Sequence, residues 1–106
     1  MEKQLEDSLV DRFTLAGFVE SCRLLEEGIA SMKDIDLGLR AGAGYTQGPF
    51  AWADGIGLDV ILEKLETLEK EFGPRFKPPA MLRDLIARGN LGQKTGRGFY
   101  EYGGAA

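Results

Sequence analysis

The stretch that decides the fold reads Gly42-Ala-Gly-Tyr-Thr-Gln-Gly48-Pro49-Phe50-Ala-Trp52-Ala-Asp54. A second stretch of the same kind, Gly92-Gln-Lys94-Thr95-Gly96-Arg97-Gly98-Phe99-Tyr100-Glu101-Tyr102, lies near the end of the chain. Clustered glycines permit tight backbone turns, and the bulky aromatic residues among them anchor those turns by burying large side chains. Both stretches therefore predict fixed turns between helices rather than flexible linkers.

Residues 5–27, upstream of the first stretch, have the apolar spacing of one long helix. Gly28 is placed to end it. Gly17, inside the helix, costs about 1 kcal/mol relative to alanine and leaves room for the close approach of a partner helix. Because the helix has two apolar stripes, we expect it to pack against more than one neighbour. The stripes are Leu15, Phe18, Cys22, Leu25 and Ile29, and an earlier, rotated one of Leu5, Leu9, Phe13 and Ala16.

Four shorter helices are predicted after the first. Ser31 is a plausible N-cap for a helix that ends near residues 40–42. Pro49 suits the first turn of a third helix, which the glycines at 55 and 57 end. Residues 58–72 form the clearest amphipathic pattern, with Glu66 and Lys70 spaced as a favourable pair. A fifth helix begins at Pro78-Pro79 and is closed by Gly89.

The remainder of the chain lacks periodicity. Residues 91–102 read as turns, with a short extended piece at 99–102, and residues 103–106 read as a frayed tail. We therefore predict an all-α fold of about five helices, with residues 1–106 forming a single domain.

Composition excludes several classes of site. The chain has 106 residues, one cysteine and no histidine. Cys22 cannot form a disulfide within the chain, and it has no histidine to activate it as a nucleophile. The ligands that zinc prefers are missing, so we predict no metal site. The charged start is unlike a secretory signal, and no apolar run could span a membrane, so we expect a cytoplasmic protein.

Three local motifs suggest chemistry that their surroundings do not support. Gly42-Ala-Gly44 resembles part of a dinucleotide-binding loop, but Gly48 is misplaced for the third glycine and no strand is predicted before it. Gly92-Gln-Lys94-Thr95 is only a fragment of a phosphate-binding loop. Acidic pairs such as Glu26-Glu27 and Asp34/Asp36 are expected to be solvated helix-surface carboxylates.

Taken in order, three groups of residues resemble the C-terminal domain of 3-hydroxyacyl-CoA dehydrogenases. The resemblance runs from about residue 8 to residue 102, and it implies a helical domain of the 6-phosphogluconate dehydrogenase C-terminal type. Its segments are Val10-Asp11-Arg12 with Glu20–Gly28 and Ser31–Asp36, then Gly42–Gly44 with Gly48-Pro49-Phe50, Ala53-Asp54 and Gly57-Leu58-Asp59, then Pro78-Pro79 with Leu91-Gly92 and Lys94–Tyr100.

The resemblance implies a role in a two-part enzyme. Such dehydrogenases oxidise the 3-hydroxyl group of an acyl-CoA, pass hydride to NAD bound on a Rossmann domain, and use a histidine–glutamate pair on that domain. The helical domain closes over the acyl part of the substrate and often forms the dimer interface. We therefore expect no cofactor bound by these 106 residues alone, NAD only through a Rossmann domain, a homodimer, and no turnover in isolation.

Asp11 and Arg12 are the candidate site residues, and they carry a departure from the family. The family usually has Asn-Arg at these positions, and the asparagine is associated with the catalytic site. An amide can donate a hydrogen bond, whereas an ionised carboxylate only accepts one. A carboxylate would also place negative charge near a developing alkoxide. Asp11 is thus either part of an altered substrate site or a surface residue of the first helix.

Charge is distributed unevenly along the chain. Acidic residues dominate positions 1–73 and basic residues dominate positions 74–106, within an overall net charge of −4. The basic part could attract an anionic partner such as the phosphates of coenzyme A, or it could pair with the acidic helices of the same chain. Nucleic acid is not expected. The basic residues are Arg75, Lys77, Arg83, Arg88, Lys94 and Arg97.

Two functions remain open from the sequence. The first is the substrate-binding and dimerisation domain of a 3-hydroxyacyl-CoA dehydrogenase, which needs a nucleotide-binding partner. The second is a non-catalytic module that binds acyl-CoA or serves assembly.

Overall fold

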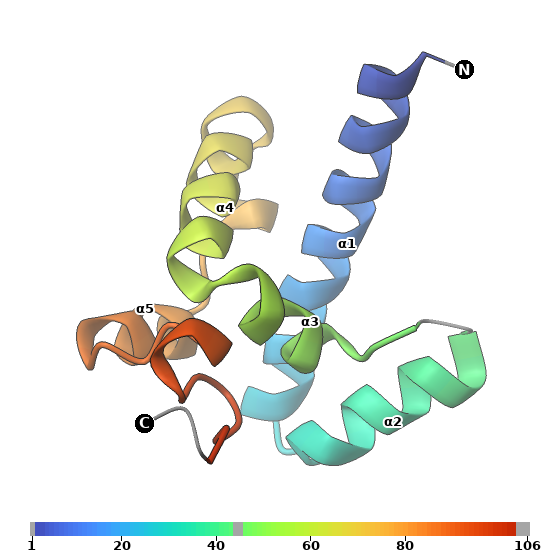
Figure 1. The fold of residues 1–106 in the computed structure, drawn as a ribbon. Coiled ribbons are helices and arrows are strands. Elements are labelled where there is room, and N and C mark those ends of the chain that lie inside the picture. Colours follow the sequence, from blue (N-terminus) through green and yellow to red (C-terminus); the bar gives the residue numbers. More distant parts are fainter. Residues whose placement is uncertain (1, 44–45, 104–106) are drawn as a thin grey trace.

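The computed structural model describes residues 2–43 and 46–103. Over this part of the chain it has five α-helices and two short 3-10 helices, and it contains no β-strand beyond isolated bridges (Figure 1). The prediction of an all-α fold with about five helices is confirmed. The helices are α1 Lys3–Glu26, α2 Met32–Ala43, α3 Pro49–Ile56, α4 Leu58–Phe72 and α5 Ala80–Ala87; the 3-10 helices are η1 Pro74–Phe76 and η2 Gln93–Thr95.

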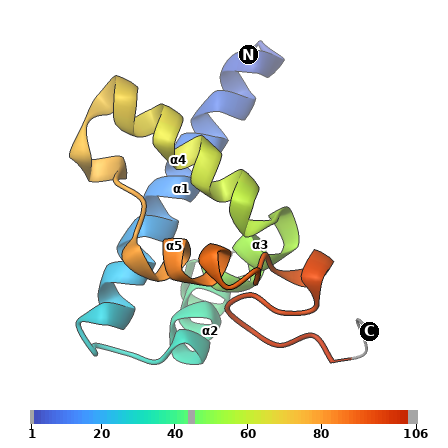
Figure 2. The same ribbon diagram turned by 90° about the vertical axis from the view of Figure 1, so that its left-hand side faces the viewer.

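Helix α3 lies at the centre of the arrangement. It contacts α1, α2, α4 and η2, while α4 also packs on α5 and on η1. The first turns of α1 extend beyond the rest of the bundle, at the end opposite the C-terminal segment, in both views (Figures 1 and 2). All of residues 2–11 are exposed, and the buried part of α1 begins only at Leu15.

Three phenylalanines from distant parts of the sequence meet in the core. Phe18 of α1 lies edge-on to Phe50 of α3, with ring centroids 6.2 Å apart, and to Phe99, at 5.8 Å. Phe50 and Phe99 are 4.9 Å apart. Such pairs add about 0.5–1.5 kcal/mol each beyond the burial of their area. Both glycine-aromatic stretches therefore contribute anchors to a single core, as predicted.

Helix boundaries follow the local signals closely. Helix α4 begins and ends at the predicted residues, and Pro49 occupies the first turn of α3. The Ser31 hydroxyl accepts a hydrogen bond from the Asp34 N–H at 3.1 Å, which makes Ser31 a cap for α2. Gly28 adopts a φ of 72°, the left-handed conformation that ends a helix with little cost only at glycine.

Several detailed predictions are wrong because distant contacts decide them. Glu66 pairs with Arg83 of α5 at 3.3 Å and not with Lys70 of its own helix. Ile29 continues the predicted apolar stripe of the first helix, but it is 67% exposed. A side chain built at Gly17 would meet nothing within 4 Å, so no helix in the described part of the chain approaches it closely.

The C-terminal segment is also more bent than expected. In place of an extended piece at residues 99–102, the structure has bends and single bridges that pair Arg97 with Gly92 and with Glu101. Gly44 and Tyr45, part of the first glycine-aromatic stretch, lie outside the described residues, as do residues 104–106 of the predicted frayed tail.

Candidate functional site

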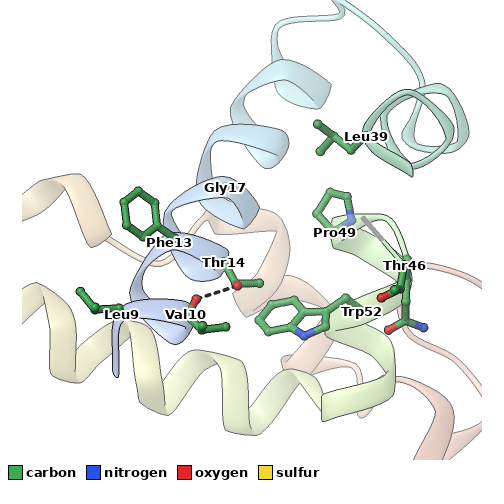
Figure 3. Close-up of a pocket in the computed structure, with 10 residues that line it drawn as sticks. Leu9, Val10, Phe13, Thr14, Gly17, Leu39, Thr46, Pro49 and Trp52 are labelled. Atoms are coloured by element: carbon green, nitrogen blue, oxygen red, sulfur yellow. Dashed lines mark hydrogen bonds between the residues drawn. The ribbon is translucent and has the colours of Figure 1, made fainter. Parts of the chain in front are cut away.

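Hollows flank the exposed first half of α1, and two of them are larger than the third. The first, here called the α1–α4 groove, has a volume of about 660 Å³ and includes both candidate residues, Asp11 and Arg12. The second, here called the α3 pocket, has a volume of about 450 Å³ and lies between α1, α2 and α3 (Figure 3). Volumes in this range suit small-molecule ligands.

The α3 pocket is lined mainly by apolar side chains. Phe13 and Leu9 border it from α1, and Trp52, Pro49 and Leu39 border it from the other side (Figure 3). The Thr14 hydroxyl donates to the Val10 carbonyl at 2.7 Å, so its proton is used within α1. This pocket could receive an aliphatic group or an apolar side chain, but it presents no acid or base.

Asp11 lies in the α1–α4 groove and bridges two helices. Its Oδ2 accepts a hydrogen bond from Lys64 Nζ of α4 at 2.8 Å. The two side chains are 52% and 42% exposed. An ion pair this exposed contributes about 0–1 kcal/mol. The sequence placed Asp11 on the first helix but gave no sign of Lys64, which is 53 positions away.

Arg12 packs its guanidinium on aromatic rings. Arg12 Cζ lies 3.8 Å from the centroid of the Phe72 ring and 5.8 Å from that of Phe76. A cation over a ring face is attracted by the ring quadrupole, and the contact is worth about 0.5–1 kcal/mol at exposed sites. Asp11 and Arg12 are neighbours in sequence, but they engage different partners on α4 and η1.

Asp36 contradicts the expectation of a solvated surface carboxylate. It is 7% exposed, and its two oxygens accept hydrogen bonds from the backbone N–H groups of Phe50 at 2.9 Å and Ala51 at 3.1 Å. A carboxylate at this position satisfies unpaired donors and complements the positive end of the α3 dipole. Gly48-Pro49 could have indicated this contact. A helix that starts without a local side-chain cap needs a hydrogen-bond acceptor from another part of the chain.

Asp54 is a second buried carboxylate, and the sequence reasoning missed its role. It is 1% exposed and accepts hydrogen bonds from the N–H groups of Phe99 at 2.9 Å and Tyr100 at 3.0 Å, and from the Tyr102 hydroxyl at 2.6 Å. Gly98 passes so close to this carboxylate that a side chain there would collide with it. The contacts of both aspartates, with backbone N–H groups and tyrosine hydroxyls, assign them a structural role.

Some of the basic C-terminal residues form ion pairs with acidic residues of the same chain. Arg83 pairs with Glu66, Lys94 Nζ lies 2.5 Å from Asp59 Oδ1, and Arg97 pairs with Glu101 at 3.6 Å. The hydrogen bond from Lys94 lowers the pKa of Asp59. Intramolecular pairing thus accounts for half of the predicted patch.

Other candidate chemistry receives no support. Burial raises the pKa of the Cys22 thiol to about 12, so the group is neutral and inert at pH 7. No cluster of three potential metal ligands occurs among the described residues. Within the same residues, no helix combines the length and apolar character needed to cross a membrane.

The residues present also do not fit a dinucleotide. Gly42 is part of α2, and the described residues contain no strand for a pyrophosphate-binding loop to follow. The mixed α1–α4 groove and the apolar α3 pocket instead lie on the surface of an all-helical domain.

Comparison with known proteins agrees with this class. Residues 9–102 match the family model of the 3-hydroxyacyl-CoA dehydrogenase C-terminal domain. The chain therefore belongs to this domain family, and the resemblance recognised from the sequence is confirmed.

Relatives and solved structures cover the same domain. Mouse mitochondrial hydroxyacyl-coenzyme A dehydrogenase is 42% identical over 89% of this chain and 31% of its own length. A 3-hydroxybutyryl-CoA dehydrogenase of Mycobacterium tuberculosis is 33% identical over 89% of this chain and 33% of its own.

Among structures, (S)-3-hydroxybutyryl-CoA dehydrogenase PaaH1 of Ralstonia eutropha superposes with a TM-score of 0.81 at 42% identity, covering 87% of this chain and 33% of that one. The Escherichia coli 3-hydroxybutyryl-CoA dehydrogenase superposes with a TM-score of 0.82 at 36% identity, and the match covers 88% of this chain and 20% of that one. The chain thus spans about a third of the length of the curated relatives it matches.

Proposed function

We propose that this chain acts as the helical substrate-binding and dimerisation part of an NAD-dependent 3-hydroxyacyl-CoA dehydrogenase, working with a Rossmann domain that carries the cofactor. The observation that carries the proposal is the match of residues 9–102 to the C-terminal domain family. The relatives named above are hydroxyacyl-CoA dehydrogenases, which favours an acyl-CoA substrate.

In this proposal the α1–α4 groove contributes to the substrate site through Asp11 and Arg12. The groove is lined by apolar side chains, which suit an acyl group, and by charged side chains of both signs. Asp11 remains an acceptor where the family usually supplies an amide donor, so its own carboxylate cannot stabilise a developing alkoxide by donating a hydrogen bond. The Lys64 ammonium, paired with Asp11, offsets the local negative charge.

The 106 residues are proposed to be inactive alone. Hydride transfer needs a hydride carrier and a proton acceptor held in contact with the substrate, and the sequence contains no histidine. We expect no NADH oxidation when acetoacetyl-CoA is added to the purified chain, and activity when a relative's separately expressed Rossmann domain is supplied. Turnover by the chain alone would overturn the proposal.

Self-association is proposed from the exposed apolar side chains of α1. Leu5, Leu9, Val10 and Phe13 are 53%, 41%, 58% and 77% exposed, a concentration that usually marks an interface. We expect a homodimer by light scattering, which Phe13→Ser should shift toward monomer. A wild-type chain that stays monomeric at high concentration would exclude this part of the proposal.

A non-catalytic acyl-CoA-binding or assembly module is the alternative, favoured by the acceptor at position 11. Calorimetry with acetoacetyl-CoA distinguishes a binding module from an assembly module. A binding module should release or absorb heat with millimolar ligand, and an assembly module should not. The cytoplasmic location expected from the sequence stays a prediction, and the mouse relative is named as mitochondrial. Fractionation of the native host would decide it.

A further inference from the structure

Two guanidinium groups from different elements converge on one pair of aromatic rings. Arg12 of α1 lies over Phe72, as described above, and Arg75 of η1 has its Cζ 6.0 Å from the Phe72 centroid and 5.5 Å from that of Phe76. The two rings are 6.2 Å apart, so both cations share the same small aromatic surface. The Arg12 guanidinium is close enough to stack on Phe72, an arrangement that leaves the N–H donors at its edge able to face a ligand.

The two positive charges have no acidic partner within residues 2–43 and 46–103. Arg12 and Arg75 take part in none of the ion pairs of this region, although other arginines do. The adjacent carboxylate, Asp11, is bound to Lys64 instead. Like charges brought together repel, and ring faces offset this only in part. The cluster therefore presents two guanidinium groups that no ion pair among the described residues engages.

An apolar pocket opens beside this cluster. It has a volume of about 340 Å³ and is lined by Leu9, Arg12, Phe13, Ala16, Arg75 and Phe76. Its walls are therefore hydrocarbon and aromatic apart from the two guanidiniums. This volume lies at the lower end of the range for small-molecule sites. Arginine forks match carboxylate and phosphate oxygens, while the remaining walls suit an alkyl chain.

We infer that this pocket, here called the Arg12–Arg75 pocket, binds an amphipathic oxyanion: an alkyl chain that ends in a carboxylate or a phosphate. The guanidiniums receive the oxyanion, and the chain lies against Leu9, Phe13 and Ala16. The inference goes beyond the proposed function, because it requires neither coenzyme A nor a Rossmann domain.

Calorimetry of the purified chain with octanoate and with octyl phosphate tests the inference. Octanol, acetate and inorganic phosphate serve as probes that lack either the charge or the chain. We expect both amphipathic anions to bind and the three partial probes to bind at least tenfold more weakly, since both halves of the ligand contribute. The stronger of the two anions identifies the preferred headgroup.

Matched variants locate the binding. Arg75 is exposed, so Arg75→Gln should leave the fold intact and weaken octanoate binding about tenfold, through the loss of one charge-assisted contact. Arg75→Lys should weaken octanoate binding by a smaller factor than Arg75→Gln does. Lys77→Gln removes the same charge two residues away, from a side chain that does not line the pocket, and should change binding less than twofold.

Fluorescence of the single tryptophan can tell binding in the α3 pocket from binding in the Arg12–Arg75 pocket, because Trp52 borders only the first of these two pockets. Backbone amide shifts that centre on Ala16 and Phe76, with little change in Trp52 fluorescence, support the inference. Three results would overturn it: no binding at millimolar octanoate or octyl phosphate, binding that Arg75→Gln and Lys77→Gln weaken equally, or shifts that centre on Trp52. None of these readouts uses acyl-CoA or a Rossmann domain, so the enzymatic part of the proposed function is tested separately. Because Leu9 and Phe13 also belong to the proposed dimer interface, the titrations are made at a concentration at which light scattering shows a monomer.

Discussion

The Tyr100 hydroxyl donates a hydrogen bond to Asp36 Oδ2 over 2.8 Å, joining residues 64 positions apart in the sequence. Asp36 in turn accepts the first N–H groups of α3, and the N–H of Tyr100 donates to Asp54 near the end of that helix. The C-terminal segment is thus fastened to both ends of α3 through two buried carboxylates. This network fixes the central helix, against which the α3 pocket is built.

Replacing Asp54 should release the C-terminal segment. Asp54→Asn keeps the shape of the side chain but leaves one of the two N–H donors, those of Phe99 and Tyr100, facing an amide N–H₂. Leaving a buried donor unsatisfied costs about 1–3 kcal/mol, so we expect a loss of about 1–3 kcal/mol in unfolding free energy by urea titration.

The matched control for this change is Asp84→Asn, on an exposed position of α5. It should stay within about 0.5 kcal/mol of the original chain. Equal stability of the two variants would show that the Asp54 network contributes nothing special. Hydrogen exchange should also speed up at the amides of Phe99 and Tyr100 in Asp54→Asn alone.

Two glycine substitutions should change stability in opposite directions. A Cβ at Gly98 would lie 2.6 Å from Gly92 Cα and would collide with the Asp54 carboxylate, so Gly98→Ala should destabilise by about 1–3 kcal/mol. Gly38 is exposed within α2 and meets nothing within 4 Å, so Gly38→Ala should stabilise by about 0.5–1 kcal/mol. Thermal melts of the two variants check the signs, and a stabilising Gly98→Ala would contradict the packing described.

Alkaline pH should weaken the fold. Burial raises the pKa of Cys22 from 9.0 to about 12, and burial together with hydrogen bonds to Asp36 and Asp54 raises the pKa of Tyr100 and Tyr102. The folded state therefore binds more protons than the unfolded state above pH 9, so stability is full below that pH and is lost as pH rises toward 12.

Urea midpoints measured from pH 8 to pH 11 should fall steadily above pH 9. Cys22→Ala removes the thiol contribution and should flatten the first part of this decline. A midpoint that rises or stays constant over the range would contradict the assignment of these buried neutral groups.

Asp11→Asn should barely affect stability. Its partner Lys64 is exposed and can return to solvent, so the change in unfolding free energy should be below about 1 kcal/mol. Lys64→Met, compared with Lys70→Met on the same helix, tests the pair from the other side. If Asp11→Asn cost several kcal/mol, Asp11 would be a structural residue and its assignment to a substrate groove would lose its basis.

Much of the candidate site could be located from the sequence, but its contacts could not. The position of Asp11-Arg12 on the first helix followed from apolar spacing together with the family resemblance. The partners Lys64 and Phe72 did not, because nothing local indicates which side of α4 faces α1. The paired residues of the basic segment show the same limit, since Arg83 could have reached several acidic side chains and the packing of α5 on α4 selected Glu66.

Five helices and the turns between them could be predicted from local sequence signals, because periodicity, caps, prolines and glycines act over a few neighbouring residues. Which polar groups are buried depends on how distant segments pack together, and local signals do not show it. Asp34 and Asp36 look alike in sequence, yet Asp34 is exposed. Asp36 is buried and accepts hydrogen bonds from the first N–H groups of α3 and from the Tyr100 hydroxyl. The reason is physical: burial and hydrogen bonding of a carboxylate depend on which distant backbone donors the packed helices bring within 3 Å of it.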